Sequence, residues 1–348
     1  MSRLPGLVAS GMARPRAFPR PGSGGNYTPP EVAVVGSTAN GAGSGPAGPR
    51  VAPAAGAGSG RASMCDHSSM APGSDLRRRL AGVRGLLLDV DGVLVLRGKL
   101  IPGAAEALAA LDAAHFPYRL ATNYSLFSRA TLSGEFAKAG VVIPPEWIVS
   151  AASAAAAYAR RHFGAEPIYV MSSADARVEF EGLTLMSHDE AAEPGARAAA
   201  VIVGDAGEEF TPRNIQSAFA LLRGGARFVA MHRNRWWITP AGVMLDSGAY
   251  VAALEFGAER RALDTGKPAR AFFAEGVGQL RVPAADVAMV GDDLWNDVRG
   301  AQKAGLRGVF VGSGKHGDAE LARVAAERGG RAPDAVAPSI AEVVDALS

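Results

Sequence analysis

The sequence is poor in cysteine, in net charge and in long apolar runs, and each shortage excludes a class of protein. Among 348 residues there is one cysteine, Cys65, so no disulfide can form within the chain and a reducing, cytoplasmic location is expected. No uninterrupted run of about 18 apolar residues occurs, so we predict no membrane span. The formal net charge of +2 is too small to indicate a nucleic-acid or membrane partner.

The first part of the chain has the composition of a disordered tail. Residues 1–75 consist mainly of Gly, Ala, Pro, Ser and Arg, and acidic residues are scarce before Glu31. Such a segment buries too little apolar surface to offset the entropy of ordering, so we predict disorder. Repeated Gly and Pro interrupt the amphipathic helix that a transit peptide needs. We interpret the tail as a non-catalytic extension, with Met64 or Met70 as a candidate natural start.

From about residue 84, short apolar runs alternate with helical stretches, a pattern typical of a parallel α/β sheet. One buried strand, in RGLLLDVDG, ends at Asp89. The strand YRLAT ends at Thr122 and Asn123, and DVAMVGDD ends at Asp292. Because open parallel sheets place ligands at the carboxyl ends of their strands, we expect these polar groups to share a site. The predicted fold class is α/β, with a doubly wound, mostly parallel sheet.

A second, inserted α/β domain is predicted at residues 146–250. It has its own strands in IYVMS, AAVIVGD and RFVAMH, and its own helix after Thr211 and Pro212. The first pattern returns beyond it, so the catalytic core is predicted to comprise residues 76–145 and 251–348.

The string DVDGVL places Asp89 and Asp91 two positions apart, directly after a strand. One carboxylate can attack phosphorus while the other donates a proton to the leaving oxygen. Close carboxylates repel a phosphate dianion, so a divalent cation is needed, and Mg²⁺ suits oxygen ligands. In GDDLWND, Asp292 is a candidate metal ligand, and Asp293 and Asp297 are candidates for bracing it.

Three further residues are candidates for holding the phosphoryl group. Lys267, in GKP, offers a compact cation for the phosphate and for Asp89. Thr122 and Asn123 offer hydroxyl, amide and backbone donors.

The strings DVDGVL, TN, GKP and GDDLWND occur in the order of the four motifs of the haloacid dehalogenase superfamily of phosphatases. The resemblance covers about residues 84–346. An insertion between the TN and GKP strings resembles the class with a large α/β cap. Within it, GVMLDSGAYVAALEFGA and GDDLWNDVRGAQKAG look most like the phospholysine phosphohistidine inorganic pyrophosphate phosphatases and their domain-containing relatives.

This resemblance implies roles for individual residues. Asp89 would be the nucleophile and Asp91 the general acid and base, with the Asp91 backbone carbonyl and Asp292 also on the metal. Thr122, Asn123 and Lys267 would hold the transferring phosphoryl group.

The sequence departs from the resembled family at two places. Tyr124 occupies the third position of TNYS, where the family often has Asn or Glu, and its ring is predicted to alter access to the phosphate. Asp91 is present here although the mammalian phospholysine enzyme lacks that aspartate, so the mechanism has more support than the substrate.

Several cap residues have two readings. Core packing is predicted for Trp236 and Trp237 rather than stacking on a substrate, with one ring directed inward and the other partly exposed. A polar loop and a substrate contact both remain open for His232, Arg233, Asn234 and Arg235, and a helix cap and a site contact both remain open for Asp205. Surface positions are predicted for His188 and His316.

The sequence therefore predicts a Mg²⁺-dependent phosphatase of a small phosphorylated metabolite, with no nucleic-acid or membrane partner. Members of the resembled class often pair through the cap, which leaves a homodimer open. The alternative is a phosphate-binding scaffold with little activity on the same fold. A dehalogenase is disfavoured, because it would not need the second acidic cluster.

Overall fold

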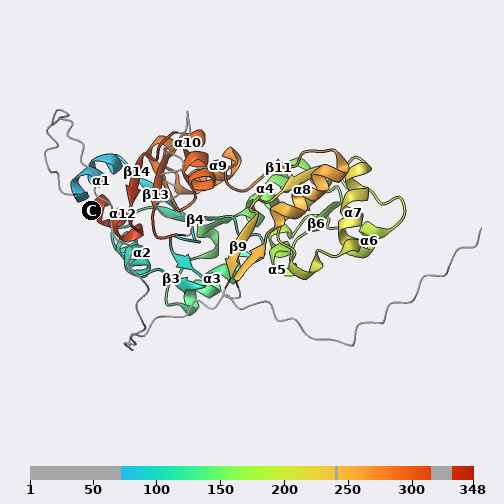
Figure 1. Ribbon diagram of the computed structural model, residues 1–348, viewed down its shortest axis with the longest axis horizontal. Helices are drawn as coiled ribbons and strands as arrows, with labels where there is room; N and C mark the ends of the chain where they lie inside the picture. The colour runs from blue at the N-terminus through green and yellow to red at the C-terminus, as the bar shows by residue number, and fades with distance from the viewer. Residues whose placement is uncertain (1–71, 240–241, 315–330) are drawn as a thin grey trace, which may run out of the picture. The chain divides into compact units, whose positions relative to one another are not determined.

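The computed structural model describes residues 72–239, 242–314 and 331–348 (Figure 1). The predictions for Cys65, for the two candidate start methionines and for His316 lie outside these residues, as does nearly all of the predicted tail. Helix α1 (Pro72–Leu80) begins within the range predicted to be tail, and it buries Leu76 and Leu80.

The core sheet has six strands, and all neighbouring pairs in it are parallel. Their order across the sheet is β14 (Ala335–Ala337), β13 (Arg307–Val311), β12 (Val287–Gly291), β1 (Gly85–Leu88), β4 (Tyr118–Thr122) and β5 (Ile148–Ser150). The three strands with predicted site residues at their ends, β12, β1 and β4, are therefore neighbours. The predicted parallel α/β sheet is confirmed.

Helices cover both faces of the core sheet because its central strands are apolar on both sides. Along β1, Leu86 and Leu88 pack into one cluster with α2 and α12, whereas Leu87 packs into another with α9 and α10. This alternation is the two-residue period of a strand, so a continuous apolar run predicts a sheet covered twice. The helices of this part are α1, α2 (Ala104–Ala113), α3 (Arg129–Lys138), α9 (Arg270–Leu280), α10 (Gly300–Ala304) and α12 (Ile340–Leu347), with the short turns η1 (Pro145–Trp147) and η4 (Ala284–Asp286).

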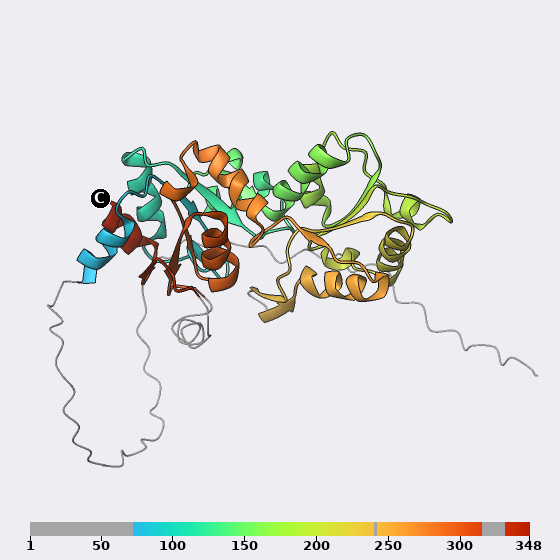
Figure 2. The same cartoon turned by 90° about the horizontal axis from the view of Figure 1, so that it is seen from above.

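The cap sheet has four parallel strands, in the order β11 (Leu263–Asp264), β8 (Arg227–Ala230), β7 (Ala200–Val203) and β6 (Ile168–Met171). Helix α4 (Ala151–His162) packs on one face, and α7 (Pro212–Arg223) and α8 (Ser247–Ala258) pack on the other. Figure 2 shows α4, in green, and α8, in orange, on opposite sides of the strands. The smaller elements here are α5 (Ala174–Arg177), η2 (Val178–Phe180), α6 (His188–Ala192), η3 (Gly207–Glu209) and the hairpin of β9 (Trp236–Thr239) with β10 (Gly242–Leu245).

Local sequence signals explain where the cap helices begin. The Thr211 hydroxyl accepts a hydrogen bond from the Asn214 N–H and Pro212 is the first helical residue, so the predicted start of α7 is confirmed. Ser150 and Ser153 form a capping box that starts the alanine-rich α4.

The described helices include none that is long and apolar enough to cross a membrane. The domain boundaries at residues 145 and 250 stay a prediction. Within the range predicted to be cap, β5 belongs to the core sheet, and within the range predicted to be core, β11 belongs to the cap sheet.

Candidate active site

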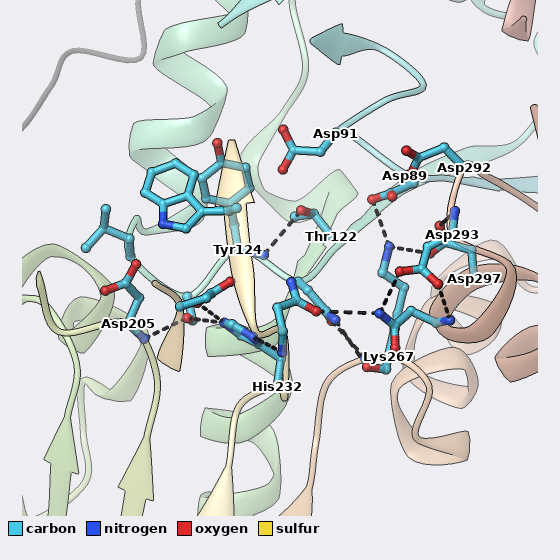
Figure 3. Close-up of a pocket in the computed structure, with 17 residues that line it drawn as sticks. Asp89, Asp91, Thr122, Tyr124, Asp205, His232, Lys267, Asp292, Asp293 and Asp297 are labelled. Atoms are coloured by element: carbon cyan, nitrogen blue, oxygen red, sulfur yellow. Dashed lines mark hydrogen bonds and ion pairs between the residues drawn. The ribbon is translucent and has the colours of Figure 1, made fainter. Parts of the chain in front are cut away.

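The site lies at the carboxyl ends of three neighbouring strands of the core sheet. Asp89 follows β1, Thr122 ends β4 and Asp292 follows β12, and all three side chains are buried. The backbone holds Asp89 in place, since its N–H donates to the Val290 carbonyl at 2.9 Å and its Oδ1 accepts from the Val90 N–H at 2.8 Å. The sheet order thus brings these three predicted residues together (Figure 3).

Lys267 is the cation of the site. Its Nζ lies 2.7 Å from Asp89 Oδ1 and 2.6 Å from Asp297 Oδ1, and its side chain is 3% exposed. Burial disfavours the ammonium, but the negative charges of Asp297 and Asp89 outweigh this and raise the pKa of Lys267. The lysine therefore stays charged between the two carboxylates.

Three buried carboxylates could hold a metal ion. One oxygen each from Asp89, Asp292 and Asp297 lies within 4.8 Å of the others. Glycines make room for this group, because a Cβ at Gly92 or Gly314 would clash with the Asp292 carboxylate. With Lys267, the three carboxylates carry a formal charge of −2, which a divalent cation would neutralise.

Burial, together with the Asp89 charge, raises the pKa of Asp297 well above its ordinary value, although Lys267 opposes this shift. A bound cation would favour the ionised form. The donor set and its charge therefore fit Mg²⁺, which prefers carboxylate oxygens.

The predicted bracing residues lie in a short π-helix, η5 (Leu294–Arg299), which follows β12. The Asp293 carboxylate accepts from the Trp295 and Asn296 N–H groups, so it caps this helix. Asp297 Oδ2 accepts from the Asp293 N–H at 3.1 Å, and Asp297 is fully buried. The two predicted bracing residues thus differ in role. Asp297 contacts Lys267 directly, whereas the carboxylate of Asp293 orders the first turn of η5.

Asp91 lines the same pocket but is not one of the three clustered carboxylates. Figure 3 shows its carboxylate directed away from Asp89 and Asp292, on the side of Thr122 and Tyr124. The positive φ of Gly92, +86°, lets the chain turn immediately after it. The two aspartates of DVDGVL thus face different parts of the pocket.

Asn123 joins two segments that are 144 residues apart. Its Oδ1 accepts from the Lys267 N–H at 2.8 Å, and its Nδ2 donates to the Lys267 carbonyl at 3.1 Å. Both ends of the amide are therefore engaged by the Lys267 backbone. Thr122 Oγ1 accepts from the Tyr124 N–H at 3.2 Å.

The pocket extends from these groups to residues of the cap. Its lining comprises Asp89, Asp91, Thr122, Asn123, Tyr124, Ser125, Leu126, Asp205, His232, Asn234, Trp237, Asp246, Lys267, Asp292, Asp293, Asn296 and Asp297. Sequence reasoning missed Ser125, Leu126, Asp246 and Asn296. Asp246 follows the apolar string GVML, so a strand-end signal was present for it, whereas no pattern marked the other three.

An aromatic pair lines the pocket beside Asp91. The rings of Tyr124 and Trp237 lie edge to face, 6.3 Å apart. Burial raises the pKa of Tyr124 well above its ordinary value, and the nearby aspartates add to the shift, so the phenol stays protonated. Trp236 is partly exposed on the hairpin, as predicted for one of the two rings, whereas Trp237 contributes to the pocket wall instead of packing in the core.

The other cap predictions separate into pocket residues and structural residues. His232, Asn234 and Asp205 line the pocket, and burial raises the pKa of Asp205. Arg233 does not, because it pairs with Glu255 and Asp264 within the cap. Arg235 is exposed and lies outside the pocket lining.

His188 keeps 27% of its side chain exposed and also bridges two other residues of the cap. Its ring joins the Tyr169 hydroxyl at 2.8 Å to the Glu209 carboxylate at 2.9 Å. No local pattern indicated these contacts, because the two partners come from β6 and η3, which are separate from the helix of His188.

Two family models match the chain: haloacid dehalogenase-like hydrolase over residues 86–185, and HAD-hydrolase-like over residues 264–343. The human phospholysine phosphohistidine inorganic pyrophosphate phosphatase is 34% identical over 244 residues, which are 68% of this chain and 86% of that protein. The rat haloacid dehalogenase-like hydrolase domain-containing protein 2 is 31% identical over 242 residues, which are 70% and 89% of the two chains. The solved p-nitrophenyl phosphatase from Archaeoglobus fulgidus is 25% identical, with a TM-score of 0.69 over 76% of this chain and 99% of that one.

Proposed function

The chain belongs to the haloacid dehalogenase-like hydrolases, and from this premise we propose that it is a Mg²⁺-dependent phosphatase that acts through an aspartyl phosphate on Asp89. The observation that carries the proposal is the contact of the buried Asp89 carboxylate with Lys267 beside two further carboxylates. A carboxylate held next to one cation and at a candidate metal site is suited to attack phosphorus rather than carbon.

In the first half-reaction, an Asp89 oxygen bonds to phosphorus while the bond from phosphorus to the leaving oxygen breaks. Asp91, protonated, gives its proton to that oxygen. In the second half-reaction, Asp91 takes a proton from water, and the water oxygen bonds to phosphorus as the acyl phosphate breaks. Orthophosphate leaves, and Asp89 is a carboxylate again. The position of the Asp91 carboxylate, away from Asp89 and Asp292, supports this division of roles.

The remaining site residues hold charge in place. Lys267 and Thr122 bind the transferring phosphoryl oxygens, and Asn123 keeps the Lys267 backbone at the end of β4. Asp89, Asp292 and the Asp91 carbonyl would hold Mg²⁺, with Asp297 and Asp293 as supports. When bound, the cation neutralises the phosphoryl oxygens and the carboxylates around them.

The pocket wall supports a leaving group that is neutral or cationic. Seven aspartates line the pocket, and Lys267 is the only lysine or arginine in its lining among the described residues. Asp205, Asp246 and the Tyr124–Trp237 pair form the part contributed by the cap and its neighbouring loop, and an aromatic face also attracts cations. A phosphomonoester or phosphoramidate with an amine fits this wall better than pyrophosphate, whose leaving group is an anion.

The test is the hydrolysis of p-nitrophenyl phosphate with Mg²⁺ and with EDTA. We expect activity in Mg²⁺, loss of it in EDTA, and loss in Asp89→Asn by at least about 10³-fold. Asp345→Asn, which changes an exposed aspartate on α12, is the matched control and should retain wild-type activity. Full activity of Asp89→Asn would refute the nucleophile, and activity unaffected by EDTA would refute the metal.

The cytoplasmic location and the homodimer stay predictions. The substrate is proposed to be a small phosphorylated metabolite.

A further inference from the structure

Ser125 has a buried hydroxyl group that the proposed reaction does not use. It follows β4 by three residues, is 2% exposed and lines the pocket. Its backbone carbonyl accepts from the Ser172 hydroxyl at 2.7 Å, which fixes the backbone of this residue against the cap.

Two nitrogen atoms lie within hydrogen-bond distance of the Ser125 oxygen. The Asp205 N–H donates to Oγ at 2.8 Å, and His232 Nε2 lies 2.7 Å from the same atom. The backbone N–H of Asn234 donates to His232 Nδ1 at 3.3 Å, so we assign the ring proton to Nε2. His232 then donates to Ser125, and Ser247 Oγ, 3.2 Å from Nε2, shares that proton.

These contacts fill both lone pairs of the Ser125 oxygen and leave its proton without an acceptor. A serine hydroxyl accepts two hydrogen bonds and donates one. With the His232 proton assigned to Nε2, none of the hydrogen bonds among the described residues has the Ser125 hydroxyl as its donor. A buried donor requires an acceptor, and the open side of this hydroxyl is the pocket.

The position of the Ser125 hydroxyl indicates which part of a bound substrate it would contact. Figure 3 shows Asp205 and His232, the two partners of Ser125, on the side of the pocket away from Asp89 and Asp292. The phosphoryl group is bound at the latter side under the proposed function. An acceptor near Ser125 would therefore belong to the leaving group.

We propose that Ser125 is a specificity-determining residue that donates a hydrogen bond to an oxygen acceptor on the leaving group, and that His232 is its positioning residue. This inference rests on the proposed function for the place of the phosphoryl group. A leaving group with an ether, hydroxyl or carbonyl oxygen two or three carbons from the phosphate is the class that it predicts.

The experiment measures binding instead of turnover, so that it remains informative if the proposed reaction fails. Calorimetry with Asp89→Asn in Mg²⁺ compares 2-methoxyethyl phosphate with n-butyl phosphate, and 3-methoxypropyl phosphate with n-pentyl phosphate. Each ether has an acceptor and no additional donor relative to its alkyl partner. We expect the ether to bind about threefold to tenfold more tightly in at least one pair.

Variants in the same background identify the donor. Ser125→Ala should remove the preference for the ether, and Ser125→Thr should keep it. Ser133→Ala, which removes a hydroxyl that bonds to the Ile143 carbonyl outside the pocket, is the matched control and should keep it as well. Equal affinities of ether and alkyl ligands at both lengths, or a preference that survives in Ser125→Ala, would overturn the assignment.

Two readouts test His232. His232→Gln retains an N–H near the place of Nε2 and should keep part of the preference, whereas His232→Leu should lose it. The ¹⁵N spectrum of the wild-type ring should show a protonated Nε2 and an unprotonated Nδ1. The opposite tautomer would overturn the positioning role even if His232→Leu fails to fold.

Discussion

Replacing Lys267 with methionine would remove the one positive charge that two buried carboxylates share. The Lys267 ammonium lies 2.7 Å from the Asp89 carboxylate and 2.6 Å from that of Asp297. At an effective dielectric constant of 20, each Coulomb attraction is about 6 kcal/mol, before the free-energy cost of burying the charges is subtracted. Removing one partner of a buried ion pair costs about 3–5 kcal/mol after that subtraction. We therefore expect Lys267→Met to lose about 3–5 kcal/mol of unfolding free energy in EDTA.

The size of this loss should depend on pH and on Mg²⁺. Because the pKa of Lys267 is raised by folding, its stabilisation is fully present below the unfolded pKa, near 10.5, and is lost only as the pH rises through the folded value. The pKa of Asp297 is also raised, so at low pH its carboxylate is protonated and the variant no longer buries this unpaired negative charge. The loss should grow as the pH rises and Asp297 ionises, and it should shrink when Mg²⁺ replaces EDTA.

Urea unfolding followed by circular dichroism measures these free energies in both buffers. Lys303→Met, which changes an exposed lysine on α10, is the matched control and should stay within about 0.5 kcal/mol of wild type. A loss below about 1 kcal/mol for Lys267→Met in EDTA at pH 8 would contradict the reasoning.

Three further outcomes follow from the described geometry. In Gly92→Ala, the new Cβ clashes with the Asp292 carboxylate, so the Mg²⁺ concentration for half-maximal activity should rise at least about tenfold. The control is Gly140→Ala, which has a similar φ of +84° and open space, and which should show only the backbone strain of about 1–3 kcal/mol. Equal Mg²⁺ dependence in the two variants would contradict the idea that Gly92 makes room for the Asp292 carboxylate. For the leaving group, kcat/KM should fall in the order phosphoethanolamine, ethyl phosphate, phosphoglycolate, with at least about a tenfold span, and the reverse order would refute a preference set by the acidic wall. Deleting residues 1–71, which ends before α1, should leave kcat/KM unchanged, and a large loss would assign the tail a catalytic role.

The sequence was informative wherever a residue's role depended on its distance from a strand end. Asp89, Thr122 and Asp292 could be placed together because parallel strands end at one edge, and the buried runs of β1, β4 and β12 were clear. Gly92 and the GKP string gave similarly local signals.

The rest of the pocket depends on contacts that no local pattern encodes. Ser125, His232 and Asp205 come from three separate segments, and only the packing of the cap brings them together. Trp237 was misjudged for the same reason, because it lies on a two-stranded hairpin and lines the pocket instead of packing in the core. Asn123 was predicted to bind phosphate, but its amide could not be assigned to the Lys267 backbone without knowing that a loop 144 residues away approaches it.

The two hydrogen bonds between the Asn123 side chain and the Lys267 backbone depend on the amide nitrogen of Asn123. Deamidation, a common route of chemical ageing, would convert the Asn123 Nδ2 into an oxygen facing the Lys267 carbonyl, 3.1 Å away, and would replace an attraction with a repulsion. A protein aged in storage could thus lose the placement of its lysine while every other group of the site stays chemically intact.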